Sequence, residues 1–451
     1  MLAGVIMFIS FRALTIVGRN SCFSIHLGRL VAAFLLLATS SVLAQESPLS
    51  LLRAIELALG NSRLLSSQDL AISAAHDMAS AVGQLPDPVL KFGIDNLPVN
   101  GSDRGSVTND FMTMRRLGIE QEMTRSEKRE LRSQIYERSA DKVLAEKNLL
   151  RAQLERDTAL AWFDRFYAER LVVMIAEQVA QAKLEIDVVE ANYRGGRGSQ
   201  ADIFAARSAL AMAEDRQSDA ARKLRNAKAM LNRWIGSAVD MPLADAPQID
   251  QLTYSLEVLE KNIGHHPQMA LLSTQIAIAQ TDAKLAEANK KADWSIELTY
   301  QQRGPAYSNM VSVGFSLPLQ WDQTHRQDRE LSSKLAQLEQ AKAQNDEALR
   351  VHSAEVLTIS NEWQNNLQRI KRYNDEIIPL AGQRTQASLA SYRGGKTGLV
   401  ELIAARGNEI DTRLQALQLQ ADTAHLWAQL NFMYTSASQP PDGGHNNGSR
   451  N

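Results

Sequence analysis

Three segments of the chain alternate hydrophobic with polar residues, which is the period expected of a β-strand with one buried face. They cover residues 90–95, 294–301 and 311–317. A fourth segment, at 111–121, changes phase near Arg115, which predicts a β-bulge there. We expect each strand to be about ten residues long, the length that a tilted membrane strand needs. A half-buried strand of a soluble sheet shows the same alternation, so the pattern alone leaves both environments open.

Two much longer segments carry a helical pattern. No proline falls between Ser126 and Tyr193, and leucine and alanine recur there at helical spacings. The second segment runs from Arg326 to Tyr392, and its Pro379 predicts a kink or a break. At about 67 residues and a rise of 1.5 Å per residue, each helix would be roughly 100 Å long. Helices of this length are far longer than the average helix of a globular domain.

The chain contains two copies of one pattern. Residues 193–197 (YRGGR) match residues 392–396 (YRGGK), and 202–207 (DIFAAR) match 401–406 (ELIAAR), in each case 199 positions later. Self-similarity at a fixed offset indicates a repeated structural unit.

We therefore divide the chain into a first repeat at 45–245 and a second repeat at 250–437. Each repeat is predicted to hold a helix, two strands, a long helix, a Gly-Gly turn and another helix. The helix that precedes the strands is expected at about 66–84 in the first repeat and 267–291 in the second.

The composition fits an exported, mainly helical chain. Aromatic residues make up 6% and prolines number 12, which is low for a sandwich of many strands. The formal net charge of −2 gives no basic field for nucleic acid. Residues 1–44 resemble a signal peptide, with a membrane anchor as the alternative, and contain the one cysteine, Cys22. The polar segment 438–451 is predicted to be a disordered tail.

Catalytic motifs and metal ligands are few. Met112 and Met114 could bind a soft ion, but on an alternating strand they are expected to face lipid or to pack. His265 and His266 precede Pro267 as at the start of a helix, and adjacent histidines converge poorly on one ion. The sequence has no Gly-rich phosphate loop, zinc-binding His-Glu-x-x-His or Gly-x-Ser-x-Gly motif. We predict no enzyme, no resident metal and no cofactor.

Four strands cannot close a membrane barrel, and lipid does not tolerate an open sheet edge. Several chains must therefore close the barrel together, and three chains would supply twelve strands with cyclic symmetry. The long helices would continue each strand into a periplasmic tube. The predicted fold is mostly α with a small β part: a trimeric α-helical tube continued into a shared 12-stranded outer-membrane β-barrel, with four strands from each chain.

With these features in view, the chain resembles the TolC family of outer-membrane efflux channels over residues 50–437. The repeated tyrosine–glycine turns look like the periplasmic tips of that family. Five segments are similar to the branch that serves heavy-metal efflux, the cobalt–zinc–cadmium and copper/silver channel subunits. They are 85–88 (LPDP), 95–98 (DNLP), 110–114 (DFMTM), 121–123 (QEM) and 128–129 (KR). The chain departs from the family in lacking a cysteine suited to N-terminal lipidation, and from the branch in having Thr124 where proline is frequent.

The resemblance implies a homotrimeric duct in the cell outer membrane, surrounded by lipid and extended into the periplasm. It also implies two protein partners, a periplasmic adaptor (membrane fusion protein) and an inner-membrane RND pump. Substrate would pass through unchanged, and the expected substrates are heavy-metal cations. Channels for drug efflux and for type I secretion share this fold and remain alternatives. A periplasmic coiled-coil adaptor is a further alternative, which leaves the strands unexplained.

The two turns are the candidate functional site. The resemblance implies that they receive the adaptor through Arg194, Gly195, Gly196, Arg197, Arg393, Gly394, Gly395 and Lys396. The glycines are expected to adopt positive φ angles and reverse the chain. Plain helix capping beside solvated charges is the alternative.

Four further residues are candidates for the pore constriction and gate: Tyr193, Asp202, Tyr392 and Glu401. The two carboxylates fall near helix N-termini, where the helix dipole alone would favour them. The functional hypothesis is that Glu401 forms a threefold acidic ring selecting cations. A hydrogen bond from the Tyr392 hydroxyl to the Asp202 carboxylate, across neighbouring hairpins, would hold the resting tip shut.

Overall fold

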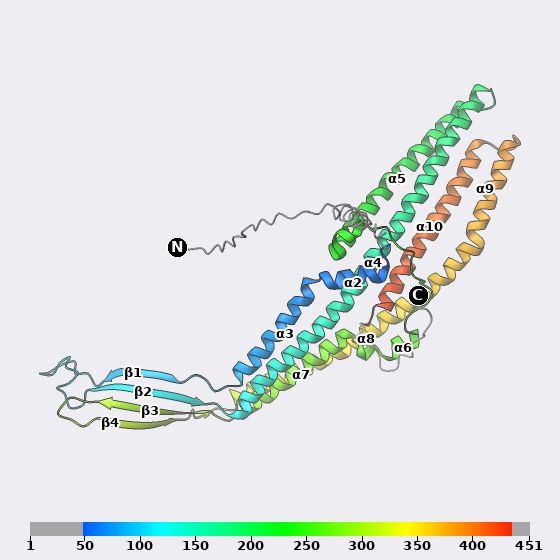
Figure 1. Cartoon of the computed structure of the whole chain (residues 1–451). Helices are drawn as coiled ribbons and strands as arrows, with labels where there is room; N and C mark the ends of the chain where they lie inside the picture. Colours follow the sequence, from blue (N-terminus) through cyan, green and yellow to red (C-terminus); the bar gives the residue numbers. More distant parts are fainter. Residues whose placement is uncertain (1–47, 435–451) are drawn as a thin grey trace, which may run out of the picture. The chain divides into compact units, whose positions relative to one another are not determined.

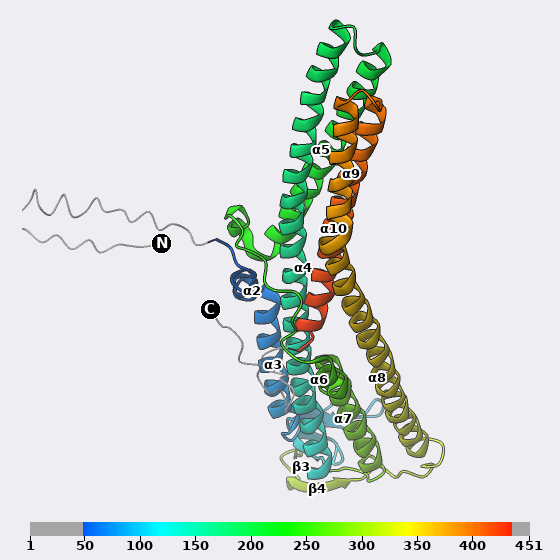
Figure 2. The ribbon, with the colours of Figure 1, turned by 90° about the vertical axis from the view of Figure 1, so that its right-hand side faces the viewer.

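The computed structural model describes residues 48–434 (Figures 1 and 2). The expected signal peptide at 1–44 and the expected tail at 438–451 lie outside the described residues. The first group of elements is α2 (Leu51–Asn61), α3 (Arg63–Val82), β1 (Val89–Asp95), β2 (Met114–Met123), α4 (Ser126–Arg194) and α5 (Gln200–Ile235).

A connection with little regular structure follows, holding η1 (Gly236–Asp240), α6 (Leu256–Lys261) and η2 (Ile263–His265). The second group is α7 (Pro267–Ala288), β3 (Trp294–Gln302), β4 (Met310–Ser316), α8 (Gln327–Arg372), η3 (Tyr373–Ile377), α9 (Ile378–Arg393) and α10 (Leu399–Asn431). The predicted order of a helix, two strands, a long helix, a turn and a helix therefore occurs twice. The short helix α2 was not predicted.

Helix α4 is continuous over 69 residues, as the absence of proline predicts. It packs along α5 through a seam of buried residues spaced seven apart, the repeat that keeps two helices in register in a coiled coil. On α4 they are Ala161, Ala168, Ile175, Ala182 and Val189, and on α5 Ala206, Ala213, Ala220 and Ala227. The small alanine side chains allow the two backbones to approach closely.

The second long helix is interrupted where proline predicts it. Pro379 has no N–H to donate to the carbonyl four residues earlier, and its ring would clash with that carbonyl. The chain accommodates this with the π-helical turn η3 just before Pro379, in which the Ile378 N–H donates to the carbonyl of Tyr373, five residues back. The predicted kink or break is therefore confirmed as a π-helical turn between α8 and α9.

The four strands form one antiparallel sheet in the order β1-β2-β3-β4. The predicted bulge near Arg115 is wrong, because β1 and β2 pair without interruption and Arg115 lies opposite Ile94. The change of phase has a different cause: Met112 precedes the strand and lies in a loop, where its N–H donates to the Asp110 carboxylate at 2.8 Å. The strands β1 and β4 have seven residues each, shorter than the expected ten, whereas β2 has ten and β3 nine.

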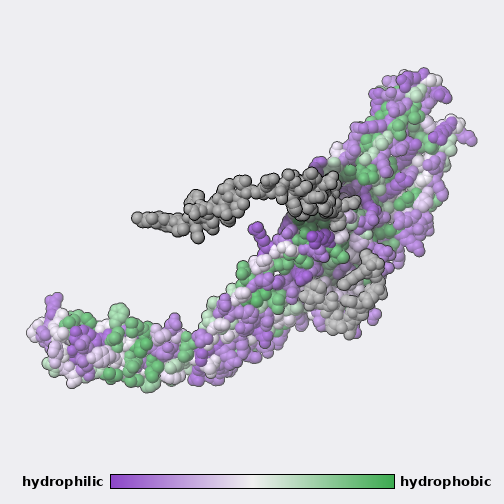
Figure 3. Space-filling view, in the orientation of Figure 1, coloured by the Kyte–Doolittle hydropathy of each residue, from purple (hydrophilic) through white to green (hydrophobic). Residues whose placement is uncertain are grey.

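Hydrophobic and polar residues alternate along each strand, and residues paired directly across strands share a face. The sheet therefore has one hydrophobic and one polar face. The hydrophobic face carries Leu90, Phe92, Ile94, Leu117, Ile119, Leu298, Tyr300, Val311, Val313 and Phe315. These side chains are exposed in the single chain: Phe92 is 81% and Phe315 73% exposed. Figure 3 shows hydrophobic residues gathered over the strands. A contiguous exposed hydrophobic surface of this kind indicates contact with lipid or with another protein.

None of the helices within residues 48–434 is both long enough and hydrophobic enough to cross a membrane.

The main hydrophobic core lies where α4 and α10 meet the connection at 236–266. Trp162 and Phe163 of α4 are fully buried there, and Trp427 of α10 packs edge-on against Phe163. Three indole N–H groups donate hydrogen bonds to backbone carbonyls of distant segments. Trp162 donates to Leu49 O (3.1 Å), Trp363 to Ile249 O (3.0 Å) and Trp427 to Gln251 O (2.6 Å). These three buried N–H groups are thus satisfied by backbone carbonyls.

The buried Arg165 fixes the same connection. Its guanidinium donates to Val239 O at 2.6 Å and to Met241 O at 2.8 Å, and pairs with Glu169 at 2.8 Å. A buried charge with three partners is stabilised, whereas an unpaired one would be costly.

Candidate functional site

The two turns lie side by side at the end of the helices opposite the strands (Figures 1 and 2). Both close with the same three backbone hydrogen bonds, at 2.9–3.0 Å. Positive φ occurs only at the second glycine of each pair, +71° at Gly196 and +67° at Gly395. The prediction is wrong for Gly195 and Gly394, whose φ angles are −82° and −79°. These two residues end a helix with ordinary negative φ, and the following glycine alone reverses the chain.

The basic residues of the turns, Arg194, Arg197, Arg393 and Lys396, are exposed. None of the four forms an ion pair with another of the described residues. Their positive charge therefore points to solvent in the single chain and is available to an acidic partner.

The two carboxylates after the turns differ. Asp202 forms a capping box with Ser199: its carboxylate accepts from the Ser199 N–H and Oγ at 2.8 Å, while Ser199 Oγ accepts from the Asp202 N–H at 3.2 Å. The helix-stabilising interpretation of Asp202 is confirmed. In the second turn Gly398 provides no capping side chain, and Glu401 is exposed on the first turn of α10. Glu401 therefore stays the candidate for an acidic ring.

Tyr392 connects the two helical hairpins, whereas Tyr193 at the equivalent position is exposed. The Tyr392 hydroxyl accepts a hydrogen bond from Asn192 Nδ2 of α4 at 3.1 Å. Within the chain the predicted hydrogen bond between Asp202 and Tyr392 does not form, because the Asp202 carboxylate is engaged by Ser199. Both residues nevertheless line one cavity between the hairpins.

The structure adds a contact that the sequence analysis missed. Arg406 of α10 forms an ion pair with Glu185 of α4 and so joins the two hairpins. The two side chains are 27% and 13% exposed, so the pair is partly removed from water, and this burial lowers the pKa of Arg406 from its usual value. The equivalent residue in the first repeat, Arg207, pairs instead with Glu190 inside its own hairpin at 3.0 Å.

Packing between the hairpins is loose around this ion pair. Two cavities, with volumes of about 440 Å³ and 650 Å³, adjoin it and share Gln181, Glu185, Leu389 and Arg406 in their walls. A void removes dispersion contacts from its lining atoms. Near the tip the hairpins are held together by Arg406–Glu185, by Asn192–Tyr392 and by a small buried hydrophobic cluster of Val189, Ala206, Leu399 and Leu402.

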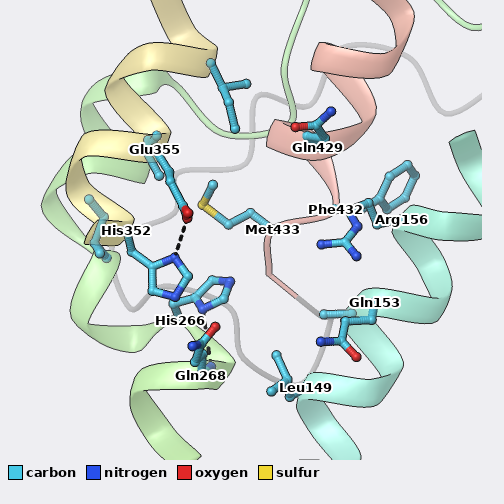
Figure 4. A pocket seen from close by; sticks show the side chains of 14 residues that line it. Leu149, Gln153, Arg156, His266, Gln268, His352, Glu355, Gln429, Phe432 and Met433 are labelled. Carbon is cyan, nitrogen blue, oxygen red and sulfur yellow. Dashed lines mark hydrogen bonds and ion pairs between the residues drawn. The ribbon is translucent and has the colours of Figure 1, made fainter. Parts of the chain in front are cut away.

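A second feature lies midway along the helices, where α4, α7, α8 and the end of α10 surround a pocket of about 380 Å³ (Figure 4). His266 caps α7, since its Nδ1 accepts the Gln268 N–H at 3.2 Å, which confirms the predicted helix start. Its ring lies 4.8 Å from that of His352, whose Nδ1 contacts Glu355 at 3.0 Å. Among the described residues no group of three His, Cys, Asp or Glu side chains is placed to hold a metal ion.

Burial lowers the pKa of His266 to about 4, with the neighbouring His352 and Arg156 adding to the effect. The imidazole of His266 therefore binds a proton near pH 6.5 in the unfolded chain, but only near pH 4 in the folded chain. The contribution of the neutral His266 to the free energy of unfolding is fully present above pH 6.5. It is lost as the pH falls towards 4, by up to about 3 kcal/mol. His266→Asn keeps a capping side chain but does not titrate.

We expect thermal unfolding in detergent to show a larger loss of Tm from pH 7.5 to 4.5 in the wild type than in His266→Asn. Carboxylate protonation contributes equally to both proteins, so the difference reports on His266. Equal losses in the two proteins would contradict the assignment.

No protein-family model matches the chain, and no curated protein matches it significantly. Solved structures do. The chain is similar to CusC, described in a study of folding and transmembrane channel formation, with a TM-score of 0.70 and 14% identity over 85% of this chain and 91% of that one. It is similar to the outer membrane protein VceC of Vibrio cholerae (TM-score 0.69, 15% identity, 85% and 95% covered). A membrane protein of Pseudomonas aeruginosa also matches (TM-score 0.72, 15% identity, 85% and 90% covered).

The chain has the fold of these outer-membrane channels. The predicted architecture, mostly α with a small four-stranded antiparallel sheet, is confirmed.

Proposed function

We propose that three copies of this chain form the outer-membrane channel of a tripartite efflux system. The observation that carries the proposal is the sheet. Its hydrophobic face is exposed, and the outer edges of β1 and β4 have no partner strand within the described residues. Such edges and such a face are both satisfied when further copies close the sheet into a barrel in lipid.

The helices extend the same channel into the periplasm. At the tip, Arg194, Arg197, Arg393 and Lys396 form a basic surface that suits acidic groups of a periplasmic adaptor. Arg406–Glu185 and Asn192–Tyr392 hold the hairpins together in the resting state. An inner-membrane pump supplies the energy, and the channel itself conducts passively.

We further propose that the exported substrates are heavy-metal cations. The segments similar to the metal-efflux branch support this proposal. In the structure, residues of these segments stabilise the ends of the strands through hydrogen bonds and an ion pair. Thr113 Oγ1 donates to Asn96 O at 3.0 Å in the β1–β2 loop. Lys128 pairs with Asp293 at 2.7 Å, and Arg129 donates to Gly83 O at 2.9 Å, both where strands meet helices. Substrate choice must then depend on the charge of the conducting path and on the partner proteins.

A strain lacking the gene tests the function. We expect hypersensitivity to one group among zinc, cobalt, cadmium, copper and silver ions, restored by the intact gene, with a dye and an antibiotic as controls. Sensitivity to the dye or antibiotic alone would move the function to drug export through the same channel. A chain that fractionates with soluble periplasmic protein would contradict the channel proposal itself.

A further inference from the structure

The polar face of the sheet carries a three-residue charged cluster. Lys91 of β1 forms ion pairs with Glu120 of β2 and with Glu297 of β3, the latter at 3.1 Å. Glu120 and Glu297 lie directly opposite each other in the β2–β3 pairing. Ser295 donates a hydrogen bond to Glu120 at 2.8 Å and Thr299 donates one to Glu297 at 3.1 Å.

The cluster places two carboxylates on neighbouring strands directly opposite each other, with one ammonium between them. Two like charges directly opposite in an antiparallel pair destabilise it, and the Lys91 ammonium offsets this repulsion. The three side chains remain 28–33% exposed and so face solvent. Lys91 and Glu297 each lie opposite a glycine, Gly118 and Gly314, so no side chain lies directly across from them there.

The polar face is acidic as a whole. Its strand residues include two basic side chains, Lys91 and Arg116, against four acidic ones, a formal net charge of −2. The acidic residues are Asp95, Glu120, Glu122 and Glu297. Arg116 and Asp95 lie 3.7 Å apart and largely compensate each other. The cluster of Lys91, Glu120 and Glu297 therefore accounts for half of the net charge.

We propose that this cluster determines the cation preference of the barrel part of the pore. The inference rests on the proposed function: when the hydrophobic face meets lipid, the polar face lines the lumen, and the cluster recurs three times around it. Rings of carboxylates attract cations and repel anions in pores. Lys91 moderates this field, since it cancels one of two carboxylates in every copy.

Reversal potentials of the reconstituted trimer in a KCl gradient test the proposal. Low ionic strength is needed, because the screening length is about 10 Å at 0.1 M salt and about 30 Å at 0.01 M. We expect Lys91→Met to shift the reversal potential towards higher cation selectivity and Glu297→Gln to shift it the opposite way. The double variant, Lys91→Met with Glu297→Gln, keeps the wild-type net charge and should return to the wild-type value.

Lys147→Met is the matched control, because it removes the same group from a helix, where Lys147 pairs with Asp69 at 2.5 Å. It should leave the reversal potential unchanged. Identical reversal potentials in the wild type, both single variants and the double variant would overturn the role of the cluster while leaving the channel intact. A wild-type trimer that does not conduct would instead overturn the proposed function, and this inference with it.

Discussion

Replacing Arg406 by alanine should raise the single-channel conductance of the reconstituted trimer several-fold. The substitution removes the ion pair with Glu185 that joins α10 to α4 between two cavities. The hydrophobic cluster of Val189, Ala206, Leu399 and Leu402 remains, but the cavities beside Arg406 leave the lost ion pair unreplaced, and the tips of the hairpins should separate more readily. Glu185→Gln should have a similar effect, and the double variant should exceed neither single one by much, because both remove the same contact.

Arg207→Ala is the control for this prediction. Arg207 is the equivalent residue of the first repeat, but it pairs with Glu190 inside one hairpin. Its loss should leave the conductance near the wild-type value. Asp202→Ala should also have little effect on conductance, since Asp202 caps α5. Equal conductance in wild type and Arg406→Ala would show that this pair does not hold the tip closed.

Replacing Trp162 by alanine should produce the largest loss of stability. The indole is fully buried, stacks on Phe166 with ring centroids 5.3 Å apart, and donates to Leu49 O. Removing a buried tryptophan side chain costs about 3–5 kcal/mol, chiefly through the cavity that remains. The Leu49 carbonyl keeps a second donor, the Ala244 N–H at 3.2 Å, so it is not left unsatisfied.

Guanidinium titration followed by helical circular dichroism measures this loss. Trp321→Ala is the matched control, because Trp321 is 86% exposed and its removal should change the free energy of unfolding by less than about 0.5 kcal/mol. Equal midpoints for the two variants would contradict the assignment of Trp162 to the core.

Much of the fold could be predicted from the sequence because its signals are local. The absence of proline predicts the unbroken α4, and Pro379 predicts the interruption at η3. Ser199 followed three residues later by Asp202 matches a capping box, and the helix-dipole interpretation of Asp202 predicted its stabilising role, whereas the gate interpretation did not. The misplaced bulge arose because alternation does not reveal where a loop ends and a strand begins.

The contacts at the tip could not be predicted in the same way. Arg406 and Glu185 are 221 residues apart in sequence, and their meeting depends on how two hairpins are rotated about their axes. The repeat gives no guide to this contact, because the equivalent Arg207 pairs with Glu190 inside its own hairpin. The cluster at Lys91 likewise depends on the register of three strands, which no local pattern fixes.

Disulfide cross-linking between β1 of one copy and β4 of the next tests the central claim most directly. Within one chain these strands are three strand spacings apart, about 14 Å, too far for a disulfide, which needs Cα atoms within about 7 Å. Leu90→Cys combined in turn with Val311→Cys, Val313→Cys or Phe315→Cys, in a Cys22→Ser background, can therefore link only separate chains. We predict bands of two and three chains, and none larger, for at least one combination under oxidising conditions. Single-chain bands for every combination, or a ladder continuing beyond three chains, would contradict a closed trimeric barrel.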